Sequence, residues 1–226
     1  MGTMRFVSLF IISLVANVVG RQPLAVAEAA SCATERPNLS MVSERSADVV
    51  AWEGCRDLPS LINRGNSKLL GFDKPEDASL AEIGRGIEIY VIGLDVLRKY
   101  NPGMAVAPLL TQLTSHIYPL SVKGEVRSSL VVSNRSNQFV TTAWGLKKLI
   151  GLVTDSQKKD PEFGFVVWVP ALNLHLLGDH HDETLRLKPL ATRTLYGLVE
   201  GEALPAAVVF ALLAHQAKVH DENNPG

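Results

Sequence analysis

The N-terminal segment most constrains this chain, because it sets both the length that folds and the compartment in which folding takes place. Arg5 precedes an apolar run at residues 6–19, which is shorter than the roughly 20 residues of a transmembrane helix. Ala25 and Ala27 then form an A-x-A cleavage pattern. This order predicts a secretory signal peptide at residues 1–27 and an exported protein, periplasmic or secreted. Arg21, just after the apolar run, keeps an uncleaved N-terminal anchor as the alternative.

The remaining residues have the composition of an ordinary globular protein. After cleavage, 20 basic and 23 acidic residues remain, a net charge of −3. Nucleic-acid binding needs a clustered basic surface, which this charge does not supply. About 200 residues are enough to bury a sizeable core, and no later segment is apolar for long enough to span a membrane. We therefore expect a globular protein with a protein or small-ligand partner and no nucleic acid.

Two cysteines, Cys32 and Cys55, belong to the part of the chain that follows the signal peptide. In an exported protein two cysteines most simply form one disulfide. The alternatives are free thiols or a nucleophilic Cys55, although the residues around Cys55 do not resemble a thiol-protease motif. The compartment therefore predicts a Cys32–Cys55 disulfide within residues 28–80, a less regular region that we interpret as an N-terminal arm.

Three consecutive strand-like segments predict an antiparallel meander in the middle of the chain. They cover residues 115–122, 126–133 and 138–144, and short polar loops separate them. In the middle segment apolar and polar residues alternate, which is typical of a sheet with one solvated face. Further strands are expected at residues 86–93, 163–169, 171–177 and 184–188, of which 163–169 is continuously apolar and should be buried on both faces.

Helical periodicity is found between these strands and at the end of the chain. We expect helices at residues 40–52 with Ser40 as the N-cap, at 95–100, at 105–113, at 146–153, and from Pro205 onward with Val208, Val209, Leu212, Leu213 and Ala217 facing inward. Strand runs with interspersed helices indicate an α+β fold. The prediction for residues 81–226 is thus one globular domain, an antiparallel sheet with helices packed on one face.

The densest group of potential metal ligands lies near residue 180. It consists of His175, Asp179, His180, His181 and Asp182. Imidazole and carboxylate groups are ligands for zinc, copper and nickel. Residues 178–183 resemble a polar hairpin loop, and pairing Leu176 with Leu185 would place His175 opposite the positive charge of Arg186. A transition-metal site is therefore a candidate that this expected hairpin geometry disfavours.

Other chemically useful residues lack the spacing that their chemistry requires. His215 and His220 lie five residues apart on the last helix and do not share a face, so a helix-surface position is expected for them. Ser128 and Ser129 lie in a strand without a nucleophile-elbow motif. The three tryptophans could line a ligand pocket, although isolated aromatic residues more often belong to the core.

Two functions follow from these observations. The first is a non-enzymatic exported module that binds a partner or an envelope component, favoured because no catalytic set is visible. The alternative is a metal-binding protein or metal-dependent enzyme that uses His175, His180 and His181. A pocket lined by converging polar groups would favour the enzyme.

Overall fold

The computed structural model describes residues 30–32, 46–181, 184–190 and 196–219, with the backbone alone for residues 30, 31, 180 and 181. The predicted signal peptide, the predicted N-cap Ser40, the candidate ligand Asp182 and the helix-surface candidate His220 lie outside the described residues.

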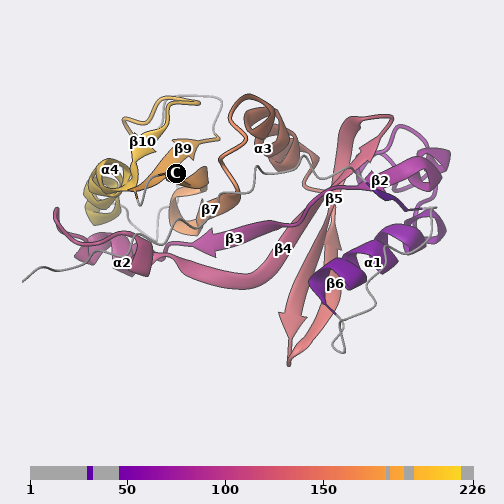
Figure 1. Cartoon of the computed structure of the whole chain (residues 1–226), viewed down its shortest axis with the longest axis horizontal. Helices are drawn as coiled ribbons and strands as arrows, with labels where there is room; N and C mark the ends of the chain where they lie inside the picture. Colours follow the sequence, from indigo (N-terminus) through magenta and orange to yellow (C-terminus); the bar gives the residue numbers. More distant parts are fainter. Residues whose placement is uncertain (1–29, 33–45, 182–183, 191–195, 220–226) are drawn as a thin grey trace, which may run out of the picture.

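Within the described residues, the chain forms ten strands and four α-helices (Figure 1). The strands are β1 (Ala30–Ser31), β2 (Ala81–Ile83), β3 (Ile87–Val91), β4 (Thr111–Val122), β5 (Glu125–Arg135), β6 (Gln138–Trp144), β7 (Phe165–Val169), β8 (Leu174–His181), β9 (Thr184–Pro189) and β10 (Leu204–Pro205). The helices are α1 (Ala47–Leu61), α2 (Leu94–Lys99), α3 (Lys147–Lys159) and α4 (Ala206–Val219), with short 3-10 turns at Pro75–Leu80, Ala107–Leu109 and Pro170–Leu172.

All ten strands belong to one mixed sheet in which only the β3–β7 pair is parallel. The long strand β4 is its centre, because β2 and β3 follow one another along one edge of β4 while β5 pairs with the other edge. Between β2 and β3 the chain stays close to β4: the N–H of Gly84 donates to the carbonyl of Pro119 at 2.8 Å. The expected α+β class is confirmed in this coarse form.

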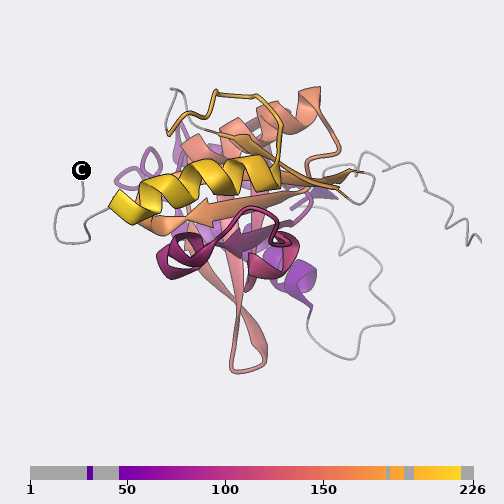
Figure 2. The same ribbon diagram turned by 90° about the vertical axis from the view of Figure 1, so that its left-hand side faces the viewer.

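The predicted meander is present as β4, β5 and β6. Its second turn is the pair Ser136 and Asn137, both with positive φ (51° and 61°), the conformation of a two-residue hairpin turn that follows the twist of the strands. The β5–β6 hairpin projects from the rest of the sheet in both ribbon views (Figures 1 and 2). The prediction was therefore correct for the order and the turns of these strands, although β4 begins four residues earlier than expected.

Helices pack on both faces of the sheet, which corrects the expectation of a single covered face. Strand β5 lies between α1 and α3: Leu130 and Val132 belong to the apolar cluster of α1, whereas the intervening Val131 packs against the cluster of α3. Successive strand residues point to opposite faces, so the two helices lie on opposite sides of β5, as Figure 1 shows. The polar residues of β5 had suggested that one face of this strand is in contact with solvent. Ser129 on that face is instead fully buried.

The far end of the sheet is covered by α2 and α4 (Figure 2). Phe165, Val167 and Val169 of β7 pack against this pair of helices, and Val166 points to the α3 side. The predicted burial of β7 on both faces is thus correct for four of its five residues, the exception being Trp168, which is 38% exposed. On α4 the expected inward positions are correct for Val209, Leu213 and Ala217 but wrong for Val208, which is 46% exposed.

Helix α1 begins at a different serine from the one expected. Ser46 is the N-cap, and its hydroxyl accepts the N–H of Val49 at 3.4 Å. The helix then continues beyond Trp52 to Leu61. Two other boundaries also changed: residues 105–113 hold a 3-10 turn and the start of β4 rather than a helix, and Pro170–Leu172 is a 3-10 turn rather than the start of a strand.

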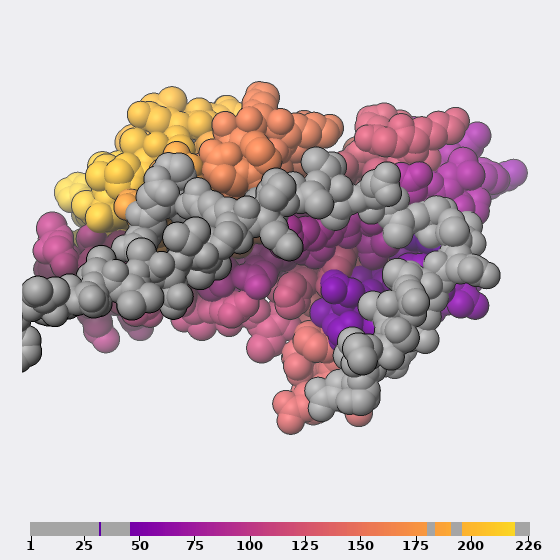
Figure 3. Space-filling model, viewed as in Figure 1, coloured from indigo at the N-terminus to yellow at the C-terminus, as the bar shows by residue number. Residues whose placement is uncertain are grey.

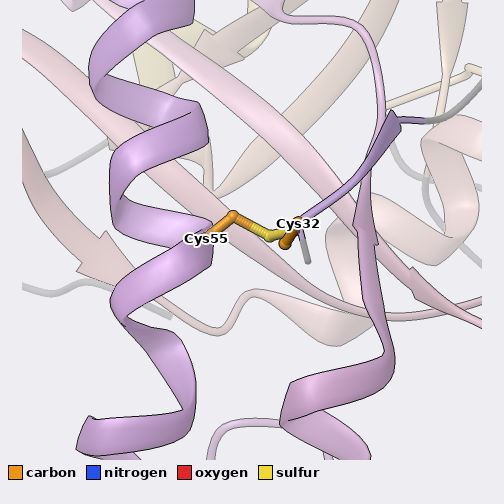
Figure 4. The surroundings of a disulfide bond; sticks show 2 residues. All are labelled: Cys32 and Cys55. Atoms are coloured by element: carbon orange, nitrogen blue, oxygen red, sulfur yellow. A yellow bond between two sulfur atoms is a disulfide. The ribbon is translucent and has the colours of Figure 1, made fainter. Parts of the chain in front are cut away.

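The Cys32–Cys55 disulfide is present and buried (Figure 4). Cys32 follows β1, and its N–H donates to the carbonyl of Ala81 in β2, while Cys55 lies in the middle of α1. The bond therefore fixes α1 to the edge of the sheet formed by β1 and β2. No helix within the described ranges combines the length and the apolar character that crossing a bilayer requires.

Candidate functional site

The predicted metal ligands lie on a longer strand than expected. Residues 178–181 continue β8, so the polar loop predicted at residues 178–183 is wrong up to His181. Leu176 pairs with Pro189 rather than with Leu185, and the residue opposite Arg186 is Asp179, not His175. Because this register differs from the expected one by four residues, an even number, the inward faces of both strands are still those predicted.

Asp179 is already engaged by a cation. Its carboxylate is buried and accepts two hydrogen bonds from the guanidinium of Arg186, at 3.2 Å from Nε and 2.6 Å from Nη2. The hydrogen bond to Asp179 raises the pKa of Arg186 above its ordinary value. A metal ion would have to compete with the charge of Arg186 for this carboxylate.

His175 is in a different environment from Asp179. Its ring stacks on Trp168, with centroids 6.0 Å apart and planes within 3° of parallel, and burial lowers its pKa, which favours the neutral imidazole. His175 precedes Asp179 by four positions along the strand, about 13 Å. Within the described part of the chain no three His, Cys, Asp or Glu residues come together as metal ligands. The side chains of His180 and His181, and all of Asp182, lie outside that part, so the metal site stays a prediction.

A second charged cluster surrounds Phe163, which precedes β7 and is buried. Lys188 Nζ lies 4.2 Å from the centroid of this ring and donates to Asp160 Oδ2 at 2.7 Å. The guanidinium of Arg186 lies 5.3 Å from the same centroid. Hydrogen bonding to Lys188 lowers the pKa of Asp160. These charges are paired with one another, which indicates a structural role in joining the end of α3 to β9.

A groove of about 610 Å³ lies along the contact between α1 and β6. Its α1 wall is one side of the helix, and its β6 wall includes residues from both faces of the strand, because Val140 alternates with Phe139 and Thr141. The lining consists of Val50, Glu53, Gly54, Arg56, Asp57, Ser60 and Leu61 from α1 and Phe139, Val140, Thr141 and Trp144 from β6. In the space-filling view the hairpin lies directly beside α1 (Figure 3). The volume is in the range of known ligand sites.

A β-bulge directs the largest aromatic residue of β6 into this groove. Thr141 pairs with Val132 and Ala143 pairs with Val131, so Thr142 is an extra residue between them. Without it, Trp144 would point to the face away from α1. The indole N–H of Trp144 is buried and has no acceptor among the described residues. Such an unsatisfied donor costs about 1–3 kcal/mol.

A second groove, of about 470 Å³, lies between α4 and the chain around Tyr100. Its lining is largely apolar and includes Val208, Leu212 and the exposed His215. The position of His215 on the helix surface agrees with the prediction. This groove has few polar groups that would orient a ligand, which makes the α1–β6 groove the stronger candidate site.

Sequence reasoning missed most of the α1–β6 groove. Trp144 was considered as a pocket residue, but Glu53, Arg56 and Asp57 were not. The one available signal was the uncharged strand at residues 138–144, the last of a meander and therefore a candidate edge strand. Ser129, by contrast, donates its hydroxyl to the carbonyl of Gly145, a local structural role.

Comparison with known proteins gave no match: no family model, no curated protein and no solved structure is similar to this chain. Its function must therefore be inferred from its own geometry.

Proposed function

We propose that this protein is an exported, non-enzymatic binding module, periplasmic or secreted, which holds its partner in the α1–β6 groove. The observation that carries the proposal is the composition of the groove: its volume of about 610 Å³ is lined by the aromatic residues Phe139 and Trp144 of β6 and by the charged residues Glu53, Arg56 and Asp57 of α1. Binding sites commonly combine an apolar lining with a few polar groups that set orientation.

Two further observations support this function. The buried disulfide is compatible with an oxidising compartment outside the cytosol. Elsewhere, the described clusters around Asp179 and Asp160 are held by their own ion pairs and need no substrate.

Site-specific photocrosslinking tests this function in cells that produce the protein. A photoreactive phenylalanine analogue replaces Ser60, an exposed groove residue, and in separate variants Val208 of the α4 groove and the exposed Lys159 of α3. We expect one defined covalent adduct from position 60 and none from positions 159 and 208. The proposal is refuted if position 60 gives no adduct, or if all three positions give the same adducts.

A further inference from the structure

The strand that borders the groove has an unpaired edge. Within the described residues β6 pairs only with β5, and the other strands that end the sheet, β1 and β10, have two residues each. Edge strands are usually protected by charged side chains or proline, but β6 contains neither. Strand β6 is thus the longest strand with such an edge that the structure describes, and all seven of its residues are uncharged.

The hairpin geometry shows which backbone groups of β6 point to this edge. Arg135 and Gln138 close the two-residue turn, and the closing pair of such a turn is hydrogen-bonded. Because N–H and C=O groups alternate between the two sides of an antiparallel strand, those of Phe139 and Thr141 point away from β5. The bulge at Thr142 ends this regular alternation, so the free edge offers two residues, or four hydrogen-bonding groups.

The same two residues direct their side chains toward α1. Phe139 packs in the apolar cluster of α1, and Thr141 lies against Gly54. A strand added to the edge of β6 would point every second side chain into the groove, between β6 and α1. Backbone pairing and side-chain recognition would therefore act on one ligand at one place.

Charge and exposure in the groove define the side chains that suit it. The guanidinium of Arg56 lies over the ring of Trp52, 5.5 Å from its centroid, whereas Asp57 is exposed one residue further along the helix. The carboxylate of Asp57 favours a basic side chain, and the exposed Leu61 together with Trp144 favours an apolar one.

We propose that the partner is an extended peptide segment that adds a strand to the free edge of β6 and directs apolar and basic side chains toward α1. This rests on the function proposed above and specifies its ligand. An antiparallel pair of β6 strands from two copies of this chain would use the same edge, and it is an alternative outcome of the test.

The test begins with a displayed library of random twelve-residue peptides, selected on the purified mature protein with its disulfide intact. A synthetic peptide of the enriched sequence is then methylated at one backbone nitrogen at a time, and its affinity is measured by isothermal titration. We expect enriched peptides to carry Lys or Arg two residues from an apolar residue. Methylation should weaken binding at least tenfold at alternate positions only, because only alternate amides pair with β6.

Substitutions in the protein show independently where the peptide binds. Asp57→Lys should lower the affinity of a basic peptide at least tenfold, while Asp155→Lys on exposed α3 should leave it within twofold. Thr141→Pro removes an N–H from the free edge and should abolish binding. Circular dichroism checks the fold of that variant, and the methylated peptides give the same information with the unaltered protein.

Several results would overturn the strand-addition proposal. They are the absence of any enriched peptide, equal effects of methylation at adjacent positions, and a dimer in sedimentation that Thr141→Pro dissociates. If one of these results occurs while the position-60 adduct persists, the groove still binds a partner, but not as an added strand. Loss of that adduct, by contrast, rejects the proposed function itself.

Discussion

Gly54 of α1 and Thr141 of β6 lie so close together that a side chain on the helix at this position would force the neighbouring side chains to shift. A Cβ atom on Gly54 would lie 2.8 Å from Thr141 Oγ1 and 2.9 Å from Leu130 Cδ1. Glycine in a helix costs about 1 kcal/mol relative to alanine, so the close approach of α1 to β6 is obtained against the preference of the helix.

Gly54→Ala should therefore lower the free energy of unfolding by up to about 2 kcal/mol, because overpacking costs about 1–3 kcal/mol and the better helix propensity returns about 1. Urea denaturation measures the change. Gly151→Ala in α3 is the matched control, since a Cβ there meets no atom within 4 Å, and it should stabilise the protein slightly. Adding Thr141→Ala to Gly54→Ala should restore part of the loss. Equal stabilisation by both single substitutions would show that α1 does not approach β6 this closely.

The disulfide should contribute substantially to stability. Cys32 and Cys55 are 23 residues apart in the sequence, and a closed loop of this length stabilises by roughly 3 kcal/mol through the restricted unfolded chain. The Cys32→Ala/Cys55→Ala double variant should lose about that amount in urea denaturation. Mass spectrometry of the purified protein without reduction checks that the bond forms. A double variant as stable as the parent, or two freely alkylated thiols, would contradict this prediction.

Acid should weaken the link between α3 and β9. The pKa of Asp160 is lowered from its ordinary value of 3.8 by its hydrogen bond to Lys188. A folded-state pKa below the unfolded one means that the stabilisation is fully present above about pH 4 and is lost as the pH falls through the lower, folded value. Thermal unfolding between about pH 2 and pH 7 measures it.

Asp160→Asn is the variant that isolates this contribution. It leaves the buried Lys188 without its carboxylate, so we expect lower stability than the parent at pH 7 and a smaller difference near pH 2. Asp155→Asn, whose exposed ion pair with Lys158 is on the same helix, is the control and should change stability little. If the stability of Asp160→Asn differed from that of the parent by the same amount at both pH values, the Asp160–Lys188 ion pair would not be the source of the effect.

The sequence predicted most elements of the sheet because their patterns are local. The alternation in β5 and the continuous apolar run of β7 each carry their own signal. The register of β8 and β9 failed because Gly178 and the polar residues after it resemble a turn. In the structure, Gly178 belongs to a strand because the ring of Phe165 covers it; a Cβ there would lie 2.2 Å from Phe165 Cε2. This contact joins residues of two different strands, so the sequence around Gly178 contains no pattern that would indicate it.

The groove was hard to predict for a related reason. Its α1 wall combines Val50, Gly54 and Asp57, which no hydrophobic period would group. The β6 wall depends on the bulge at Thr142, which turns Trp144 toward the helix. Both features arise from contacts between elements, of α1 with β6 and of β6 with β5, whereas sequence periodicity reports only which face of one element is apolar.

The last prediction concerns the candidate metal ligands His175, Asp179, His180, His181 and Asp182. We expect weak binding of zinc and copper and no change in the thermal unfolding temperature. Asp179 is held by two hydrogen bonds from Arg186, and His175 lies about 13 Å further along the strand, whereas a strong site needs three or four converging ligands.

Titration of the tag-free mature protein with each metal, followed by thermal unfolding, tests this expectation. Arg186→Gln is an informative comparison because it releases Asp179: the variant should be less stable than the parent, since a buried carboxylate is left unpaired, and metal should not restore that stability. Submicromolar, stoichiometric binding that stabilises by about 3 kcal/mol at a hundredfold excess over Kd, and that His180→Ala/His181→Ala removes, would contradict the prediction. Metal binding at β8 would then replace the groove as the leading account of function.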